Sequence, residues 1–303
     1  MEKVNLVIII VNYNSPADVL ECVESIKQSQ KMAYSYRIIV VDNCSTDNSV
    51  LLLDNKEFDF FQLSANNGYC AGNNAGIKYA DSKYEYDYVW ILNPDTEIEN
   101  TAIENLLNFA YANPVAGLIG ASLIYNFDRD TIQAIGGGNI GLSKKMNFQI
   151  LKPYFHNELF SEKKNLIPEV LECKSLIGAA LLIKKDIFNK IGYFDESYFL
   201  YSDETEYCIR VLKKTKYKLY AVKNVIVYHK EGSRKKERKF VTQYYLTRNW
   251  LYNVKKYYPY LLPYVYIYHC IYLFKIKRKK ELSSYIKRAL LDFLKGQKGK
   301  YSQ

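Results

Sequence analysis

The chain has 303 residues, 49% of them hydrophobic, so it can form one large or two modest domains with a substantial core. From His229 onward it carries 19 Lys/Arg and 4 Asp/Glu, whereas the first 228 residues carry 23 and 28, giving net charges of +15 and −5. A slightly acidic body with a basic tail excludes a nucleic-acid-binding core and indicates an enzyme whose C-terminus meets an anionic membrane surface. Six cysteines without a close pair indicate buried thiols in a reducing compartment.

Strands and helices are predicted to alternate from the N-terminus. Largely apolar runs at residues 6–11, 37–41 and 88–92, rich in β-branched or aromatic side chains, predict buried strands. Amphipathic or Gly/Asn-rich segments between them predict helices, in units of about 30 residues. This pattern predicts an α/β fold with a mostly parallel, Rossmann-like central sheet flanked by helices.

From residue 125 to 168 the alternation decays, and we expect a long, adaptable surface segment there. The regular apolar pattern resumes with a predicted strand at 176–183. Later elements are expected at 185–192 (helix), from 203 (helix), 218–222 and 225–229 (two short strands), and 240–257 and 281–295 (helices).

Two carboxylates directly follow predicted strands. Asp42 follows the second, and Asp95 follows the strand at 88–92 in the corner Asn93-Pro94-Asp95. In open α/β sheets ligands bind at the carboxyl ends of parallel strands, so both acids are expected in one crevice. Asp42 is placed to accept hydrogen bonds from a base or ribose, and Asp95 to hold Mg²⁺ or Mn²⁺. Either acid alone could merely cap the next turn or helix; together they favour a functional site.

The loop at residues 66–76 contains three glycines and four asparagines. Such a loop lets backbone N–H groups approach phosphate or sugar oxygens. It lacks both the Gly-x-Gly-x-x-Gly pattern and the Lys-Ser/Thr of a P-loop, so a flexible turn is the simpler interpretation of this loop alone.

Three acids occur at a predicted helix start, in Asp203-Glu204-Thr205-Glu206. They could simply complement the helix dipole. Alternatively, one is a general base whose pKa is raised by its anionic neighbours. His229 ends a predicted strand. A single histidine is more often structural, but opposite the Asp95 corner it becomes a candidate metal ligand.

The ordered set of motifs resembles inverting family-2 glycosyltransferases, most closely the bacterial rhamnosyltransferase-like branch. The resemblance covers about residues 5–255. It rests on Val11-Asn12-Tyr13, Val41-Asp42-Asn43, Asn67-Gly68-Tyr69 with Gly72-Asn73, Leu92-Asn93-Pro94-Asp95, Gly178-Ala179, Phe194-Asp195-Glu196 and Arg248-Asn249.

The resemblance implies a GT-A fold, a nucleotide-diphosphate sugar donor, a divalent metal and direct displacement with inversion. By register Glu204 is the catalytic base, but the family's Glu-Asp pair is inverted here, so Asp203 stays a candidate. Asn93 replaces the first acid of the DxD-like metal motif, whose last acid is Asp95; His229 is the further metal ligand. The implied donor-binding residues are Val11, Asn12, Tyr13, Asp42, Asn67, Gly68, Gly72, Asn73 and Asn93.

The expected domains are a catalytic unit at 1–235, with a nucleotide-sugar half (1–115) and an acceptor half (116–235), and a basic, Tyr-rich helical extension at 236–303. Residues 257–274 carry no formal charge and include two prolines and seven tyrosines. This composition favours an interfacial helical hairpin over a membrane span, although the length leaves a span open. A membrane-facing extension suits an acceptor carried on a lipid.

The sequence therefore predicts a hexosyltransferase-type enzyme of cell-surface polysaccharide synthesis, cytoplasmic and peripherally bound to the inner face of the cell membrane. It would transfer a sugar from a UDP- or dTDP-sugar, with dTDP-rhamnose one candidate, to a glycan or lipid-linked acceptor. Two alternatives stay open. One is a nucleotide-sugar-binding protein with a degenerate catalytic site; the other is a nucleotidyltransferase, although residues 7–15 lack the Gly-rich basic signature typical of that class.

Overall fold

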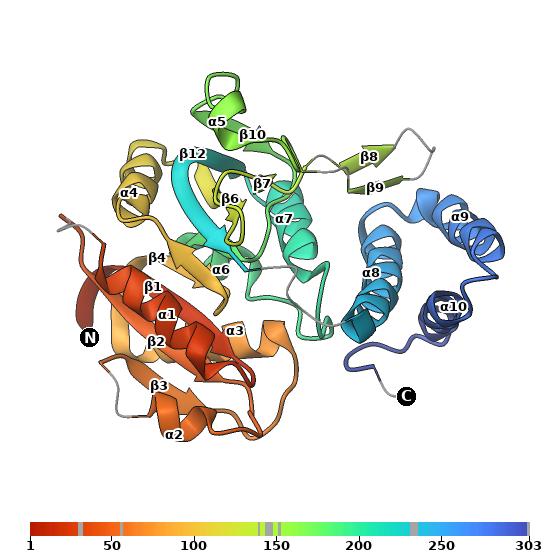
Figure 1. Cartoon of the computed structure of the whole chain (residues 1–303), viewed down its shortest axis with the longest axis horizontal. Coiled ribbons are helices and arrows are strands. Elements are labelled where there is room, and N and C mark those ends of the chain that lie inside the picture. The colour runs from red at the N-terminus through yellow and green to blue at the C-terminus, as the bar shows by residue number, and fades with distance from the viewer. Residues whose placement is uncertain are drawn as a thin grey trace.

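The structure is a computed structural model that describes residues 1–29, 33–54, 57–138, 140–142, 148–150, 153–230 and 236–301 (Figure 1). A central sheet forms the larger part of the molecule, and the C-terminal helices form a lobe beside it (Figure 1). The sheet has the strand order β10-β12-β6-β11-β4-β1-β2-β3, with β5 paired to β12 and β7 to β6.

The first half of the chain forms a parallel arrangement that confirms the predicted strands. In register, Asn12 lies beside Asp42 and Ile10 beside Leu92, so three strands end at one edge of the sheet. The strands are β1 (Glu2–Asn12), β2 (Tyr36–Asp42), β3 (Asp59–Gln62) and β4 (Tyr84–Leu92), and the helices α1 (Pro16–Lys27), α2 (Ser49–Leu53) and α3 (Tyr69–Lys83).

The second half makes the sheet mixed rather than mostly parallel. β11 (Ala180–Lys184) runs antiparallel between β4 and β6 (Ala116–Tyr125), whereas β12 (Lys218–His229) runs parallel to β6. The two short strands expected at 218–229 are one strand with an irregularity between Val222 and Ile226. The remaining elements are β5 (Thr96–Ile98), α4 (Ala102–Ala112), β7 (Ile132–Ile135), β8 (Ile140–Leu142), β9 (Phe148–Ile150), α5 (Phe160–Lys163), β10 (Val170–Cys173), α6 (Lys185–Ile191) and α7 (Asp203–Lys214).

The expectation of an adaptable surface segment at 125–168 is wrong for β7. All four residues of this strand are buried, and it pairs antiparallel with β6. Its sequence, Ile-Gln-Ala-Ile, is too short to show a clear period, and only the pairing with β6 makes it a strand.

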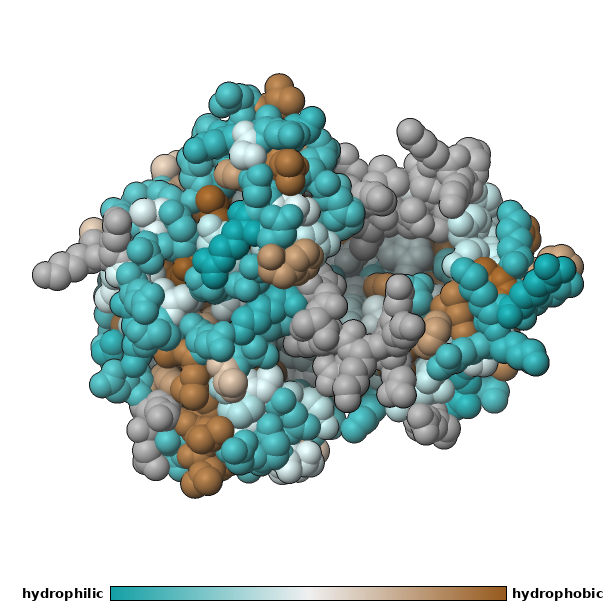
Figure 2. All heavy atoms as spheres, viewed as in Figure 1, coloured by the Kyte–Doolittle hydropathy of each residue, from teal (hydrophilic) through white to brown (hydrophobic). Residues whose placement is uncertain are grey.

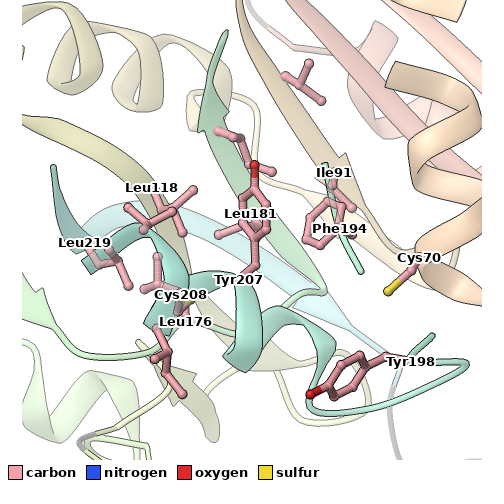
Figure 3. Close-up of a cluster of buried hydrophobic side chains, with 14 of the residues drawn as sticks. Cys70, Ile91, Leu118, Leu176, Leu181, Phe194, Tyr198, Tyr207, Cys208 and Leu219 are labelled. Atoms are coloured by element: carbon pink, nitrogen blue, oxygen red, sulfur yellow. The ribbon is translucent and has the colours of Figure 1, made fainter. Parts of the chain in front are cut away.

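Two buried clusters fill the two faces of the sheet. In the first, Ile91, Leu118 and Leu181 come from neighbouring strands and meet Tyr207 and Cys208 of α7 (Figure 3). This packing fixes α7, whose first turn carries the acid pair, against the middle of the sheet. As expected of buried thiols, Cys22, Cys70, Cys173 and Cys208 are buried and free, whereas Cys44 is half-buried and Cys270 exposed.

The C-terminal lobe contains α8 (Lys236–Tyr257), the 3₁₀ turn η1 (Pro259–Leu261), α9 (Leu262–Lys275) and α10 (Lys280–Leu294). The turn interrupts the uncharged stretch 257–274 at its first proline, and the second proline lies in the first turn of α9, where a missing N–H costs nothing. In the described part of the chain, no helix is both long and apolar enough to cross a membrane.

Candidate active site

The Asn93-Pro94-Asp95 corner lies between β4 and β5, and β5 places it against the end of β12. Because His229 pairs with Thr96 in this ladder, residues far apart in sequence become neighbours. The His229 Nε2 atom lies 3.3 Å from Asp95 Oδ1 and 3.4 Å from Asn93 Nδ2. Asp95 and His229 are both buried. The structure thus brings together the two residues that the sequence suggests as metal ligands.

Gln133 of β7 orients the His229 ring. The amide Oε1 of Gln133 lies 2.9 Å from His229 Nδ1, so Nδ1 carries the hydrogen and donates it. This tautomer turns the Nε2 lone pair towards Asp95 Oδ1. Nε2 can accept a hydrogen bond from Asn93 Nδ2, and it can also serve as a metal ligand. A hydrogen-bonded second nitrogen is usual for a metal-binding histidine.

The donor set at this corner fits a divalent cation that is shared with a substrate. Asp95 offers a carboxylate and His229 an imidazole nitrogen. Throughout the residues that the structure describes, no three His, Cys, Asp or Glu side chains gather closely enough to hold a metal ion by themselves. Mg²⁺ and Mn²⁺ are commonly held by one or two carboxylates together with substrate phosphates, and an imidazole ligand favours Mn²⁺.

We expect Gln133→Met to weaken Mn²⁺ binding by about 10–100-fold, because a change in the partner of a metal-binding histidine typically has this effect. The affinity can be measured by electron paramagnetic resonance with a nucleoside diphosphate present. Gln28→Met, at an exposed glutamine on the end of α1, is the matched control. Unchanged Mn²⁺ affinity in a folded Gln133→Met chain would show that Gln133 does not orient His229 for a metal.

On the donor side, Asn12 and Asp42 form a fully buried pair. Asp42 Oδ1 accepts hydrogen bonds from Asn12 Nδ2 at 2.7 Å and Ser45 Oγ at 2.6 Å. Its Oδ2 accepts from the Ser45 N–H at 2.9 Å and from Gln62 Nε2 at 3.0 Å. Both carboxylate oxygens are therefore used by the protein, and a nucleoside would reach Asp42 only by displacing a partner. The exposed Gln62 is the easiest to move.

Two other expected donor residues flank this pair. Val11, directly before Asn12, is buried in the core, and Tyr13, directly after it, is 45% exposed. Tyr13 is therefore the member of the first motif that can present a flat aromatic surface to a base. Contact with the donor stays a prediction for both residues.

The glycines at 68 and 72 allow close packing, and their contact with the donor stays a prediction. A Cβ on Gly68, where φ is +99°, would lie 2.3 Å from the Phe199 carbonyl oxygen. A Cβ on Gly72 would lie 2.7 Å from Val11 Cγ1. Both spaces are thus filled by protein. The glycines let the start of α3 pack closely against β1 and against the loop before α7.

The asparagines of this loop differ in exposure. Asn67 is exposed. Asn73 is buried and donates from Nδ2 to the Tyr69 carbonyl at 3.0 Å, while its Oδ1 accepts no hydrogen bond from the residues described. A buried acceptor without a partner is costly, so Asn73, which lies in the first half of α3 rather than in a loop, is the asparagine of this segment best suited to receive a hydroxyl of a ligand.

Tyr69 belongs to the Asn67-Gly68-Tyr69 motif but is not among the expected site residues, and it connects the two halves of the site. Its hydroxyl lies 3.0 Å from Asn93 Oδ1 and 3.0 Å from the Gly178 carbonyl. A Cβ on Gly178 would lie 3.5 Å from Glu204 Cβ and 3.9 Å from Tyr69 Cε1. Burial and then the charge of Asp203 raise the pKa of Tyr69 well above its usual value, so it remains a neutral hydrogen-bonding group.

The acid pair starts α7 after a strained turn. Tyr201 and Ser202 both have positive φ, at 62° and 63°. Non-glycine residues adopt this conformation only where their surroundings enforce it, and such strain gathers at functional sites. Here α8 enforces it: Asn249 Nδ2 donates to the Tyr201 carbonyl at 2.9 Å, and Asn253 Nδ2 to the Ser202 carbonyl at 3.1 Å. Although the predicted boundary assigns α8 to the extension, this helix holds the loop that places Asp203 and Glu204.

The three acids at the start of α7 differ in their partners. Asp203 is buried and accepts a hydrogen bond from the Cys70 thiol at 3.2 Å, and burial raises its pKa. Burial, followed by the charge of Asp203, raises the pKa of Glu204 well above the usual range. A carboxylate with a raised pKa is the stronger base near neutral pH. Glu206 is instead structural, since it pairs with Arg210 at 2.9 Å and Lys256 at 2.9 Å.

Comparisons with known proteins agree with this architecture. The family model described as Glycosyl transferase family 2 matches residues 7–192. The low-salt glycan biosynthesis hexosyltransferase Agl10 of Haloferax volcanii is 27% identical over 221 residues, which are 69% of this chain and 62% of that protein. The chain thus spans less than two thirds of that relative's length.

Another relative and a solved structure extend the comparison. An N-acetylglucosaminyl-diphospho-decaprenol L-rhamnosyltransferase of Mycobacterium tuberculosis is 24% identical over 214 residues, covering 65% of this chain and 67% of that protein. The mannosyltransferase PcManGT of Pyrobaculum calidifontis, solved with GDP-Man and Mn²⁺, superposes with a TM-score of 0.58 at 11% identity, covering 97% of this chain and 88% of that one. The predicted GT-A fold is confirmed.

Proposed function

The chain belongs to glycosyl transferase family 2, and we propose that it transfers a sugar, with inversion, from a nucleotide-diphosphate donor to a hydroxyl group of a glycan or lipid-linked acceptor. One observation carries this proposal. The Tyr69 hydroxyl bonds to Asn93 of the Asp95–His229 corner and to the carbonyl of Gly178, and a Cβ on Gly178 would lie 3.5 Å from Glu204 Cβ. The corner and a carboxyl of raised pKa are thus linked through Tyr69 and Gly178, which suits a displacement at one carbon between a hydroxyl and a diphosphate.

In the proposed reaction Glu204 accepts the proton of the acceptor hydroxyl. The acceptor oxygen forms a bond to the anomeric carbon while the bond from that carbon to the diphosphate oxygen breaks, which inverts the stereochemistry. The diphosphate leaves with the bonding electron pair. Asp95 and His229 would hold Mn²⁺ or Mg²⁺, which when bound neutralises charge on the diphosphate. Burial, and then the charge of Asp203, keep the pKa of Glu204 high.

The relatives support the substrate classes. One is named a glycan hexosyltransferase, another an L-rhamnosyltransferase that acts on a lipid-diphosphate sugar, and the structural neighbour was solved with GDP-Man. We therefore propose a UDP-, dTDP- or GDP-sugar as donor, and a glycan or a sugar carried on a lipid as acceptor, in the synthesis of a cell-surface polysaccharide.

A panel of UDP-, dTDP- and GDP-sugars tests the proposal, with binding measured calorimetrically in the presence and absence of Mn²⁺. We expect one nucleotide class to bind far more tightly with Mn²⁺, and its nucleoside diphosphate to be released when a sugar-diphospholipid acceptor is added. Metal-dependent binding without any release would favour the alternative of a nucleotide-sugar-binding protein, which the single carboxylate at the metal corner suggests. Release of pyrophosphate from a nucleoside triphosphate would favour a nucleotidyltransferase.

A further inference from the structure

One side of α9 and of the turn before it is apolar and exposed. Tyr260, Tyr264, Ile267, Ile271 and Phe274 are 76%, 39%, 56%, 51% and 70% exposed. Their spacing of four and three residues places them on a single side of a helix. The opposite side packs inward, with Val265 fully buried in the core. We call these five residues the α9 face.

A cluster of cations directly follows the α9 face. Lys275, Lys277, Arg278, Lys279 and Lys280 are all exposed. The sequence from residue 238 to 280 contains ten Lys/Arg and no Asp or Glu, so no acid of this segment offsets them. On the surface, hydrophobic and strongly hydrophilic residues lie side by side on the lobe that holds α9 and α10 (Figure 2).

We propose that the α9 face and its cationic cluster dock the protein on an anionic lipid bilayer, with α9 lying in the plane of the interface. The aliphatic side chains and Phe274 would enter the boundary between head groups and acyl chains, where tyrosines are also favoured. The five cations would contact anionic head groups, each strengthening binding. A helix apolar on one side only and followed by cations has the composition of an interfacial segment.

The charge pattern favours lipid over a second copy of the chain. A contact between two α9 faces would bury apolar surface but bring together segments that hold cations and no acids. Such like-charged segments oppose association between copies. An anionic bilayer instead satisfies both the apolar and the cationic part of the surface. The proposal adds a location to the proposed sugar transfer and agrees with the predicted attachment to the inner face of the cell membrane.

Flotation of the full chain with vesicles tests the proposal. We expect binding to phosphatidylcholine vesicles that contain phosphatidylglycerol, and little binding to phosphatidylcholine alone. The double substitution Ile267→Glu/Ile271→Glu should lower binding at least tenfold. Replacing Lys277, Lys279 and Lys280 by Gln should lower it by about 100-fold at low salt, because each cation near an anionic surface contributes about a fivefold effect.

The matched control is Leu51→Glu on α2, a leucine that is 81% exposed on the catalytic unit. Binding of the Leu51→Glu chain should equal that of the unsubstituted chain. Donor binding should be the same in all these variants, which separates a failure of this proposal from a failure of the proposed function. Equal binding to both vesicle types, unchanged binding after Ile267→Glu/Ile271→Glu, or a dimer that this double substitution dissociates would overturn the proposal.

Discussion

Replacing Glu204 by glutamine is expected to lower sugar transfer by about 10²–10⁴-fold, the usual contribution of a general base. Glutamine keeps the size of the side chain but cannot accept the hydroxyl proton. Donor binding should survive, since Glu204 lies towards Gly178 and Tyr69 rather than at the Asp95–His229 corner. Released nucleoside diphosphate measures the rate, and calorimetry the donor affinity.

Two variants sharpen this experiment. Glu162→Gln makes the same chemical change at an exposed position and should leave the rate unchanged. Burial and then the charge of Asp203 raise the pKa of Glu204. Asp203→Asn removes that charge, so it should shift the pH dependence to lower pH rather than abolish turnover. If Glu204→Gln transfers sugar at the full rate while Asp203→Asn is inactive, Asp203 is the base instead.

The raised pKa of Glu204 also predicts the pH dependence. The base must be deprotonated, so activity should rise with pH up to a pKa above the usual carboxyl range. The free energy of unfolding changes with pH in the opposite direction. The folded state holds this proton more tightly than the unfolded state, so the free energy of unfolding falls as pH rises from the ordinary carboxyl pKa to the raised one. Glu204→Gln removes that loss, so its melting temperature should exceed that of the unsubstituted chain at alkaline pH and match it at acid pH.

Replacing Asp95 by asparagine is also expected to have a large effect, on both Mn²⁺ affinity and sugar transfer. It removes the carboxylate that faces His229 Nε2 at 3.3 Å, and it keeps the shape of the side chain. We expect Mn²⁺ affinity in the presence of nucleoside diphosphate to fall by more than the roughly 10–100-fold typical of losing an outer-shell partner. Sugar transfer should fall with it. Paramagnetic resonance of free Mn²⁺ during titration measures the affinity.

Asp87→Asn, at an exposed aspartate of β4 remote from its carboxyl end, is the matched control and should bind Mn²⁺ normally. His229→Ala should resemble Asp95→Asn, and the double variant should lose little more than either single one, because both side chains serve one ion. Independent, additive losses would show that the two residues do not share a metal.

Much of this site could be predicted from the sequence because strand ends carry their own signals. The apolar runs ending at Asn12, Asp42 and Leu92 fix where three strands stop, and parallel pairing then places those ends together. The apolar runs are enough to predict these strand ends, without knowledge of any contact. The Asn93-Pro94-Asp95 corner follows from the same argument, because proline cannot continue the strand.

What could not be predicted depends on contacts between distant segments. Gln133 lies in a short strand whose period is invisible, and only pairing with β6 brings it to His229. Tyr69 looks like one aromatic residue among thirty tyrosines until the fold sets its hydroxyl beside Asn93. The glycines at 68 and 72 suggest an open phosphate loop, whereas the close approach of Phe199 and Val11 explains them.

The role of α8 illustrates the same limit. The Arg248-Asn249 motif is visible in the sequence. Only the structure shows that Asn249 and Asn253 hold the turn before Asp203 in place. Arg248 itself is buried and donates to the Tyr244 hydroxyl at 3.0 Å and to the Gly299 carbonyl at 2.8 Å, joining the chain end to this helix. Composition alone could place α8 only in a basic helical tail.

The position of Mn²⁺ in crystals grown with a nucleoside diphosphate is the sharpest test of a metal shared by Asp95 and His229, because anomalous scattering locates the ion without reference to activity. We expect a peak bound by Asp95 Oδ1, His229 Nε2 and oxygens of the diphosphate. A diphosphate bound at the ends of β1, β2 and β4 with its Mn²⁺ away from Asp95 and His229 would contradict it.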